Sequence, residues 1–212
     1  PLLSYLILLI NALFWRTRVI YRITDFYPEV AFAAGKVRWL ASMGPLFDSL
    51  RRSASTIEVL GEDQKERLRG DGIPLSRISL LRDTSPIEDW TSSTSVTRPF
   101  SGDFRILLYS GNLGVAHDVV TLCEGYRRHV LHGANRVRLW INGTGVRVAD
   151  VKAYCANHSL PLAITAPVPL EQLAGVLKAA DAHLITLREP FWGYVLPSKI
   201  YACLEAGQPI LF

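Results

Sequence analysis

The stretch Gly193-Tyr-Val-Leu-Pro197-Ser198-Lys199-Ile-Tyr-Ala-Cys-Leu-Glu-Ala-Gly207-Gln-Pro209-Ile-Leu-Phe212 has the pattern of a helix followed by a buried strand. Pro197 suits the first turn of a helix, and Gly207 stands where that helix should end. At the helix start, Ser198, Lys199 and Ile200 would present free amide N–H groups, and Lys199 would add a permanent positive charge. Such a helix start favours phosphate binding, although an ordinary capped helix fits the same residues.

Two further stretches upstream each combine an apolar run with a glycine turn. They read Phe104-Arg-Ile-Leu-Leu-Tyr-Ser-Gly111-Asn112-Leu-Gly114 and Val137-Arg-Leu-Trp-Ile-Asn-Gly143-Thr-Gly145. Glycine at the carboxyl end of a parallel strand lets ligand atoms approach the backbone. Together with the Lys199 helix, the two turns predict a nucleotide site at one edge of a sheet. A plain tight turn is the alternative reading of each.

Apolar strands alternate with helical segments along the chain, which is typical of parallel α/β sheets. In the first half we expect strands at 19–24, 56–60 and 77–81, with helices at 32–52 (broken at Gly44-Pro45) and 62–69. In the second half we expect strands at 104–110, 137–142, 162–165, 182–187 and 209–212, with helices at 117–132, 147–157, 169–180 and 197–206. The segment 91–103 is rich in Ser and Thr and is predicted to be a linker between domains at 1–90 and 104–212.

The order of these motifs resembles a known family. Tyr109-Ser-Gly-Asn-Leu-Gly, Asn142-Gly-Thr-Gly, Val168-Pro-Leu-Glu-Gln-Leu and Gly193-Tyr-Val-Leu-Pro-Ser-Lys resemble the donor domain of family 4 GT-B glycosyltransferases. Asp25-Phe-Tyr-Pro28-Glu29 is similar to an Asp-x-Trp-Pro-Glu signature of bacterial members that build cell-surface polysaccharides. The resemblance implies an α/β chain of GT-B type with two Rossmann-like parallel-sheet domains, both incomplete in this chain.

The resemblance also implies an activity. A complete member would move a sugar from a nucleotide-diphosphate sugar to a glycan or a lipid-linked acceptor, with retention at the anomeric carbon and without a metal or other cofactor. The donor-binding residues would be Gly111, Asn112, Gly143, Gly145, Glu189, Gly193, Tyr194, Pro197, Ser198 and Lys199. Asp25 and Glu29 would lie on the acceptor side of the cleft. No general base is assigned.

Several positions depart from the family pattern. Ala202 stands where many members have a Glu that binds the ribose, Asn112 and His117 stand where cations often neutralise the diphosphate, and Thr24 stands where a His often precedes the aspartate. These departures keep a non-catalytic nucleotide-sugar-binding homologue open as an alternative. A nucleotide-sugar 2-epimerase of the same fold is the other alternative.

Composition excludes several other classes of protein. The net charge of +4 is spread evenly without a basic stripe, so nucleic-acid binding is not expected. The three cysteines have no metal-like spacing and fit a reducing, cytoplasmic compartment. No Asp-x-Asp motif occurs, which disfavours metal-dependent sugar transferases of the other common fold. We read the chain as an internal fragment that is inactive alone.

The segment from Pro1 to Trp15 is almost entirely apolar, and Arg16, Arg18 and Arg22 follow it. A spanning helix needs about 20 apolar residues, so this segment is short for one. A buried helix and a membrane-embedded segment are both open. Peripheral contact of residues 1–22 with the inner face of the cell membrane would suit an enzyme with a lipid-linked acceptor.

Overall fold

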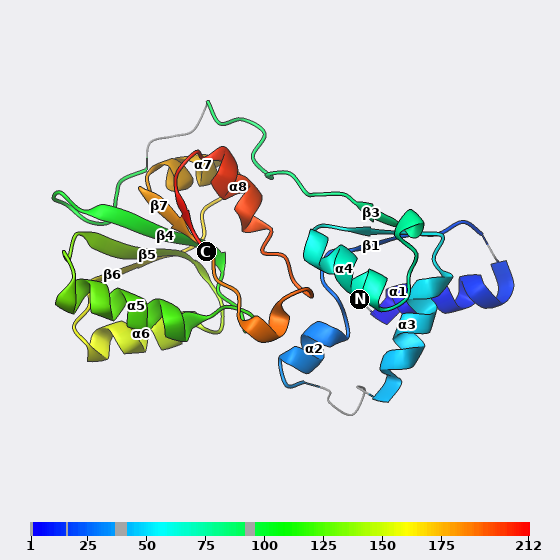
Figure 1. The fold of residues 1–212 in the computed structure, drawn as a ribbon. Helices are drawn as coiled ribbons and strands as arrows, with labels where there is room; N and C mark the ends of the chain where they lie inside the picture. Colours follow the sequence, from blue (N-terminus) through cyan, green and yellow to red (C-terminus); the bar gives the residue numbers. More distant parts are fainter. Residues whose placement is uncertain (1, 16, 37–41, 92–95) are drawn as a thin grey trace. The chain divides into compact units, whose positions relative to one another are not determined.

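The computed structural model describes residues 2–15, 17–36, 42–91 and 96–212, and the chain divides into two compact units (Figure 1). The first unit comprises Pro1–Asp83 and Glu189–Leu196, and the second comprises Thr84–Arg188 and Pro197–Phe212. The chain therefore leaves the second unit after residue 188 and returns to it at residue 197. Each unit has its own sheet, and apolar cores that pack on it.

In the described part of the first unit, three strands form a parallel sheet in the order β1-β2-β3. The strands are β1 (Ile20–Ile23), β2 (Thr56–Val59) and β3 (Ile78–Leu80). The helices are α1 (Leu2–Ile10), continued by a π-helical turn (Asn11–Trp15), then α2 (Glu29–Ala33), α3 (Gly44–Ser53) and α4 (Glu62–Gly70). The expected break near Gly44-Pro45 is the start of α3, because Pro45 is accommodated in the first helical turn. The part of the expected 32–52 helix at residues 37–41 lies outside the described residues.

Helix α1 buries one face and exposes the other. Tyr5 and Leu8 are 4% and 1% exposed and join the core with Ile23 and Phe47, whereas Leu3 is 67% exposed. No helix within the described residues has the length and hydropathy needed to cross a bilayer. The expectation of a buried helix therefore holds only for the face of α1 that carries Tyr5.

The second unit has five parallel strands among its described residues, in the order β6-β5-β4-β7-β8. The strands are β4 (Arg105–Asn112), β5 (Val137–Thr144), β6 (Leu162–Thr165), β7 (Ala182–Leu184) and β8 (Ile210–Leu211). The helices are α5 (Val119–His132), α6 (Val148–Asn157), α7 (Leu170–Lys178) and α8 (Lys199–Glu205). This alternation confirms the Rossmann-like sheet predicted for the second half.

Side-chain alternation along β4 explains the three-layered arrangement of the second unit. Tyr109 points into a core with residues of α5 and α6, whereas Ile106 and Leu108 point into a second core with residues of α7 and α8. Figure 1 shows α5 and α6 on one side of the sheet and α7 and α8 on the other. Because both faces are buried, the strands are nearly continuous apolar runs.

Part of the segment that the sequence predicts to be a linker packs on the second unit. Val96 and Phe100 lie against its core, and the Arg98 guanidinium donates to Asp181. Ile87, which lies just before the predicted linker, is buried in the same core. Residues 92–95 of the expected linker lie outside the described residues. The boundary between the units falls between Asp83 and Thr84.

Candidate functional site

Two glycine turns lie side by side at the carboxyl ends of β4 and β5. In the parallel register, Gly111 is opposite Gly143 and Asn112 is opposite Thr144. The Leu113 amide donates to the Thr144 carbonyl at 2.7 Å, which holds the turns together beyond the strands. Both turns therefore lie at one edge of one sheet, as the sequence predicts. This is the edge at which open α/β sheets bind ligands.

Close backbone approach explains why two of these positions are glycine. A Cβ on Gly143 would lie 1.9 Å from the Gly111 carbonyl oxygen, which is a severe overlap. Gly111 itself has a φ of +125°, and a Cβ there would lie 3.6 Å from the Lys199 amine nitrogen. Gly143 thus serves the packing of the two turns. Gly111 lets the Lys199 side chain lie close to the backbone of the turn.

Lys199 reaches this turn from the start of α8. Its Nζ lies 3.6 Å from the centre of the Tyr109 ring and donates a hydrogen bond to the Tyr109 hydroxyl. Burial lowers the pKa of Lys199 from its ordinary value to about 7, and the nearby Cys203 thiol opposes that shift. The expectation of a permanent charge is therefore wrong, because an amine in this surrounding carries its proton only part of the time near neutral pH.

The start of α8 differs from the prediction in its amide groups. Pro197 precedes the helix and is buried, Ser198 is the exposed N-cap without a side-chain capping bond, and Lys199 is the first helical residue. The Ile200 amide donates to the Pro197 carbonyl at 3.1 Å, so the expectation that it is free is wrong. Among the described groups at this helix start, the Lys199 amine is the one that makes direct contact with the Gly111 turn.

The remaining candidates of the second unit, Asn112 and Gly145, lie at the ends of β4 and β5. Asn112 has an exposed side chain, and its carbonyl accepts from the Tyr109 hydroxyl at 2.9 Å. Gly145 has a φ of +128°, and a Cβ there would lie 2.3 Å from the Leu113 carbonyl oxygen, so packing alone requires glycine. Arg188 follows β7, and its Nη1 donates to the Val115 carbonyl at 3.2 Å.

Two residues at this edge were missed from the sequence. Tyr109 is the last large side chain before the Gly111 turn, and Arg188 is the nearest cation after the β7 strand. Both signals are visible in the sequence, but only the packed structure shows which side chains reach the turn.

The predicted donor residues Glu189, Gly193 and Tyr194 belong to the first unit. The Tyr194 ring lies 4.3 Å from the Arg67 guanidinium carbon, and the Tyr194 carbonyl accepts from the Phe26 amide at 2.9 Å. Glu189 is exposed at a 3-10 turn. Tyr194 therefore holds the 189–196 segment within the first unit.

Asp25 and Glu29, the acceptor-side candidates, also lie in the first unit, with different surroundings. Both Glu29 oxygens accept from Arg51 Nη2, at 2.5 and 2.6 Å, and Arg51 is 1% exposed. Asp25 forms an isolated bridge with Val195, and burial raises the pKa of its carboxyl. Glu29 is therefore engaged in holding the buried Arg51. Asp25 is the more exposed residue of the two, because the Glu29 side chain is only 14% exposed.

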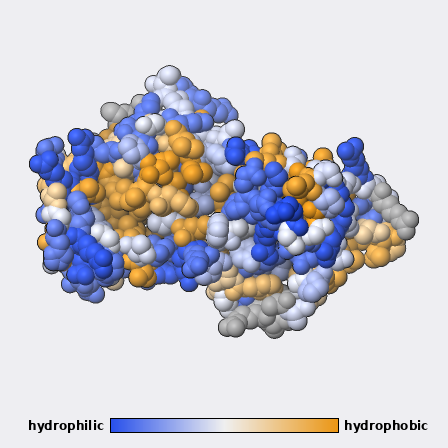
Figure 2. Space-filling model, viewed as in Figure 1, coloured by the Kyte–Doolittle hydropathy of each residue, from blue (hydrophilic) through white to orange (hydrophobic). Residues whose placement is uncertain are grey.

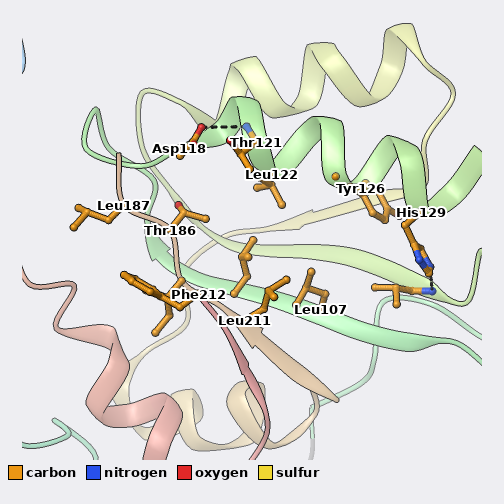
Figure 3. Close-up of a pocket in the computed structure, with 14 residues that line it drawn as sticks. Leu107, Asp118, Thr121, Leu122, Tyr126, His129, Thr186, Leu187, Leu211 and Phe212 are labelled. Carbon is orange, nitrogen blue, oxygen red and sulfur yellow. Dashed lines mark hydrogen bonds between the residues drawn. The ribbon is translucent and has the colours of Figure 1, made fainter. Parts of the chain in front are cut away.

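An apolar cavity of about 490 Å³ lies elsewhere in the second unit, between α5 and strands β4, β7 and β8 (Figure 3). Leu107, Leu122 and Leu211 line it, and Figure 2 shows apolar side chains at the surface of this region. Its ionisable lining residues already serve the fold. Asp118 caps α5 at the Thr121 amide, and His129 accepts from a backbone amide. The cavity therefore offers no reactive group comparable to Lys199.

The family positions that depart from the pattern are also accounted for. Ala202 is 6% exposed in the core beneath α8, and His117 forms hydrogen bonds at the β4–α5 loop. The Thr24 carbonyl accepts from Gln64 Nε2 at 3.1 Å in the first unit. In the described part of the chain, no group of three His, Cys, Asp or Glu side chains is placed to hold a metal ion.

No protein family model and no curated protein matches the chain, but solved structures do. Sucrose-phosphate synthase of Thermosynechococcus elongatus matches with a TM-score of 0.72 and 14% identity, over 98% of this chain and 53% of that one. HepE of Anabaena, solved with UDP-glucose, matches with a TM-score of 0.65 and 13% identity, over 98% and 56%. The lipopolysaccharide outer core galactosyltransferase WaaB, solved in its apo form, matches with a TM-score of 0.53 and 17% identity, over 86% and 59%.

The chain thus spans little more than half the length of these proteins. Identities at this level show the fold alone. The two parallel sheets and these matches confirm the fold class predicted from the sequence, which is the GT-B type with two Rossmann-like units.

Proposed function

We propose that the chain is part of a glycosyltransferase that moves a sugar from a nucleotide-diphosphate sugar to an acceptor. The observation that carries this proposal is the Lys199 amine beside the Gly111 turn, on the ligand edge of a Rossmann-like sheet. A departing diphosphate gains negative charge in the transition state, and a cation fixed at this edge stabilises that charge. Two of the fold neighbours agree with it, since HepE was solved with UDP-glucose and WaaB is a galactosyltransferase.

Three finer parts of the proposal are retention at the anomeric carbon, a glycan or lipid-linked acceptor, and transfer without a metal. They rest on the resemblance of the motifs to family 4 GT-B glycosyltransferases. Addition of a chelator to the transfer assay tests the last part, and the anomeric configuration of the product tests the first. Transfer that stops on chelation and resumes with added Mg²⁺ would refute the metal-independent step.

The first experiment measures UDP-glucose binding to the full-length protein by calorimetry, followed by transfer assays with a panel of donors. We expect Lys199→Met to weaken binding by roughly ten- to a hundredfold, because a charge-assisted hydrogen bond contributes about 1.5–3 kcal/mol. Lys152→Met, at an exposed position on α6, is the matched control and should bind like the parent. Binding without transfer would favour the non-catalytic homologue, and release of a C2-epimerised sugar would favour the epimerase.

Contact with the inner face of the cell membrane is a further part of the proposal. The observation in its favour is an exposed apolar surface at the end of α1, where Phe14 and Trp15 are 75% and 65% exposed and the exposed Arg18 follows. Aromatic and apolar side chains beside a cation suit the boundary of an anionic bilayer. Co-sedimentation with phosphatidylglycerol vesicles tests it. Binding that is unchanged in a double Phe14→Ser, Trp15→Ser variant would refute it.

A further inference from the structure

The Lys199 amine is the first member of a series of hydrogen bonds within the second unit. It donates to the Tyr109 hydroxyl, which lies 3.0 Å from His117 Nε2. His117 Nδ1 lies 2.7 Å from the Thr186 carbonyl oxygen. The Tyr109 and His117 rings meet edge to face with centroids 5.3 Å apart. Four elements of the unit, α8, β4, the β4–α5 loop and the segment after β7, are thereby connected.

The direction of each bond follows from what each atom can do. The Thr186 carbonyl can only accept, so His117 Nδ1 carries a hydrogen. Burial lowers the pKa of His117 to about 4, so its ring is neutral at pH 7 and Nε2 can only accept. Tyr109 must then donate to His117 Nε2, a proton that it shares with the Asn112 carbonyl at 2.9 Å. The Tyr109 oxygen is left to accept from Lys199.

We propose that Tyr109 and His117 are positioning residues, which hold the Lys199 amine at the Gly111 turn through this directed series of bonds. The proposal rests on the proposed function, because it assigns the amine to the diphosphate. A lysine side chain has four rotatable bonds and would otherwise move freely. Tyr109 is fully buried, so its hydroxyl is a fixed acceptor. The series therefore orders the amine before any ligand arrives, which lowers the entropy lost on binding.

The same bonds control the protonation of the amine. The titratable groups that face Lys199 in the described residues are Tyr109 from β4, His117 from the β4–α5 loop, and Cys203 one turn later on α8. Burial raises the pKa of Tyr109 beyond its ordinary range and raises the pKa of Cys203 to about 11, and His117 is neutral. None of these neighbours is charged at pH 7. The Tyr109 oxygen is thus the main hydrogen-bond partner of the protonated amine.

The test measures Lys199 directly, without nucleotide. The full-length protein is labelled with trace acetic anhydride at a series of pH values, and mass spectrometry of the Lys199 peptide gives the pH midpoint of its reactivity. Tyr109→Phe keeps the ring but removes the acceptor. We expect the midpoint to move down by roughly one unit, because the protonated form loses a hydrogen bond. UDP-glucose affinity at pH 7 should fall by roughly tenfold in parallel.

Two substitutions of His117 distinguish a role in the series of hydrogen bonds from a role in packing alone. His117→Gln keeps an acceptor near the Nε2 position and should preserve the parent midpoint, whereas His117→Asn keeps only the group facing Thr186 and should lower it. Tyr154→Phe, which removes a surface hydroxyl bound to Glu124, is the matched control and should leave the midpoint unchanged.

The outcomes distinguish the two proposals. An unchanged midpoint in folded Tyr109→Phe, or equal behaviour of the two His117 variants, would overturn the positioning role. If the variants show the predicted midpoint shifts but the parent protein binds no nucleotide, the proposed function is overturned and the hydrogen-bonded series stays in place.

Discussion

The lowered pKa of Lys199 makes a quantitative prediction for donor binding. An amine with a pKa of about 7 is half protonated at pH 7, and only about 1% protonated at pH 9. A diphosphate binds the protonated form, so binding takes up a proton and UDP-glucose affinity must fall as pH rises above 7. Below pH 7 the amine already carries its proton, and the affinity should level off.

The size of this fall is fixed by the strength of the contact. A charge-assisted bond of about 1.5–3 kcal/mol raises the pKa of the bound amine by roughly one to two units. The affinity should therefore decrease by about tenfold per pH unit at most, and by roughly ten- to a hundredfold in total between about pH 7 and pH 9. Lys199→Met lacks this charge at every pH, so its affinity should not change with pH and should stay at the low level that the parent reaches near pH 9.

The assay is calorimetry with UDP-glucose across this pH range, in buffers of different ionisation enthalpy so that proton uptake is measured independently. The parent and Lys199→Met should converge at high pH and separate below it. Lys152→Met, the exposed control on α6, should follow the parent. A flat affinity profile for the parent would refute the reasoning, and so would a Lys199→Met variant that keeps the parent's pH dependence.

Three other predictions concern stability. Gly143→Ala should destabilise the second unit by roughly 4 kcal/mol or more, as overpacking of a core does. The reason is that its Cβ would lie 1.9 Å from the Gly111 carbonyl oxygen. His183 is 1% exposed, neither ring nitrogen has a partner in the described residues, and burial lowers its pKa. Below about pH 6.5 the unfolded chain binds a proton that folded His183 does not, so the free energy of unfolding should decrease as the pH is lowered. This decrease should be smaller in His183→Leu. Arg51→Met should destabilise the first unit by about 3–5 kcal/mol, because its carboxylate partners lose a buried counter-ion.

Urea unfolding measures all three changes, and each has a matched control. Gly125→Ala, within α5 and with open space at its Cβ, should be neutral or stabilising. His132→Leu is at an exposed position and should keep the parent's pH slope. Arg69→Met removes an exposed pair with Glu66 and should have an effect below about 1 kcal/mol. Equal effects of a substitution and its control would contradict the corresponding assignment.

The sheet of the second unit could be predicted because its residues carry local signals. Apolar runs that end at Gly111 and Gly143 predicted β4, β5 and their shared edge, and the β4–β5 register confirms it. The protonation of Lys199 could not be predicted, because it depends on burial by residues distant in the sequence. For the same reason, the sequence could not show that Tyr109, 90 residues before Lys199, supports the amine.

The segment around Tyr194 shows a different limit. It follows β7 in the sequence, and its resemblance to a donor loop placed it with the second domain. Its packing partners, Phe26 and Arg67, come from the first half of the chain. No periodicity within 189–196 encodes that pairing, since an aromatic ring and a backbone carbonyl fit many surroundings.

The residence of 189–196 in the first unit has a consequence for protein engineering. A single cut between Asp83 and Thr84 does not divide the chain into its two units, because the C-terminal piece would still carry the segment 189–196, whose Tyr194 contacts Phe26 and Arg67. Chimaeras that exchange the second unit between relatives would likewise bring a foreign 189–196 segment to the recipient. Transplanting residues 84–212 should therefore succeed only when Phe26 and Arg67 are transplanted with them.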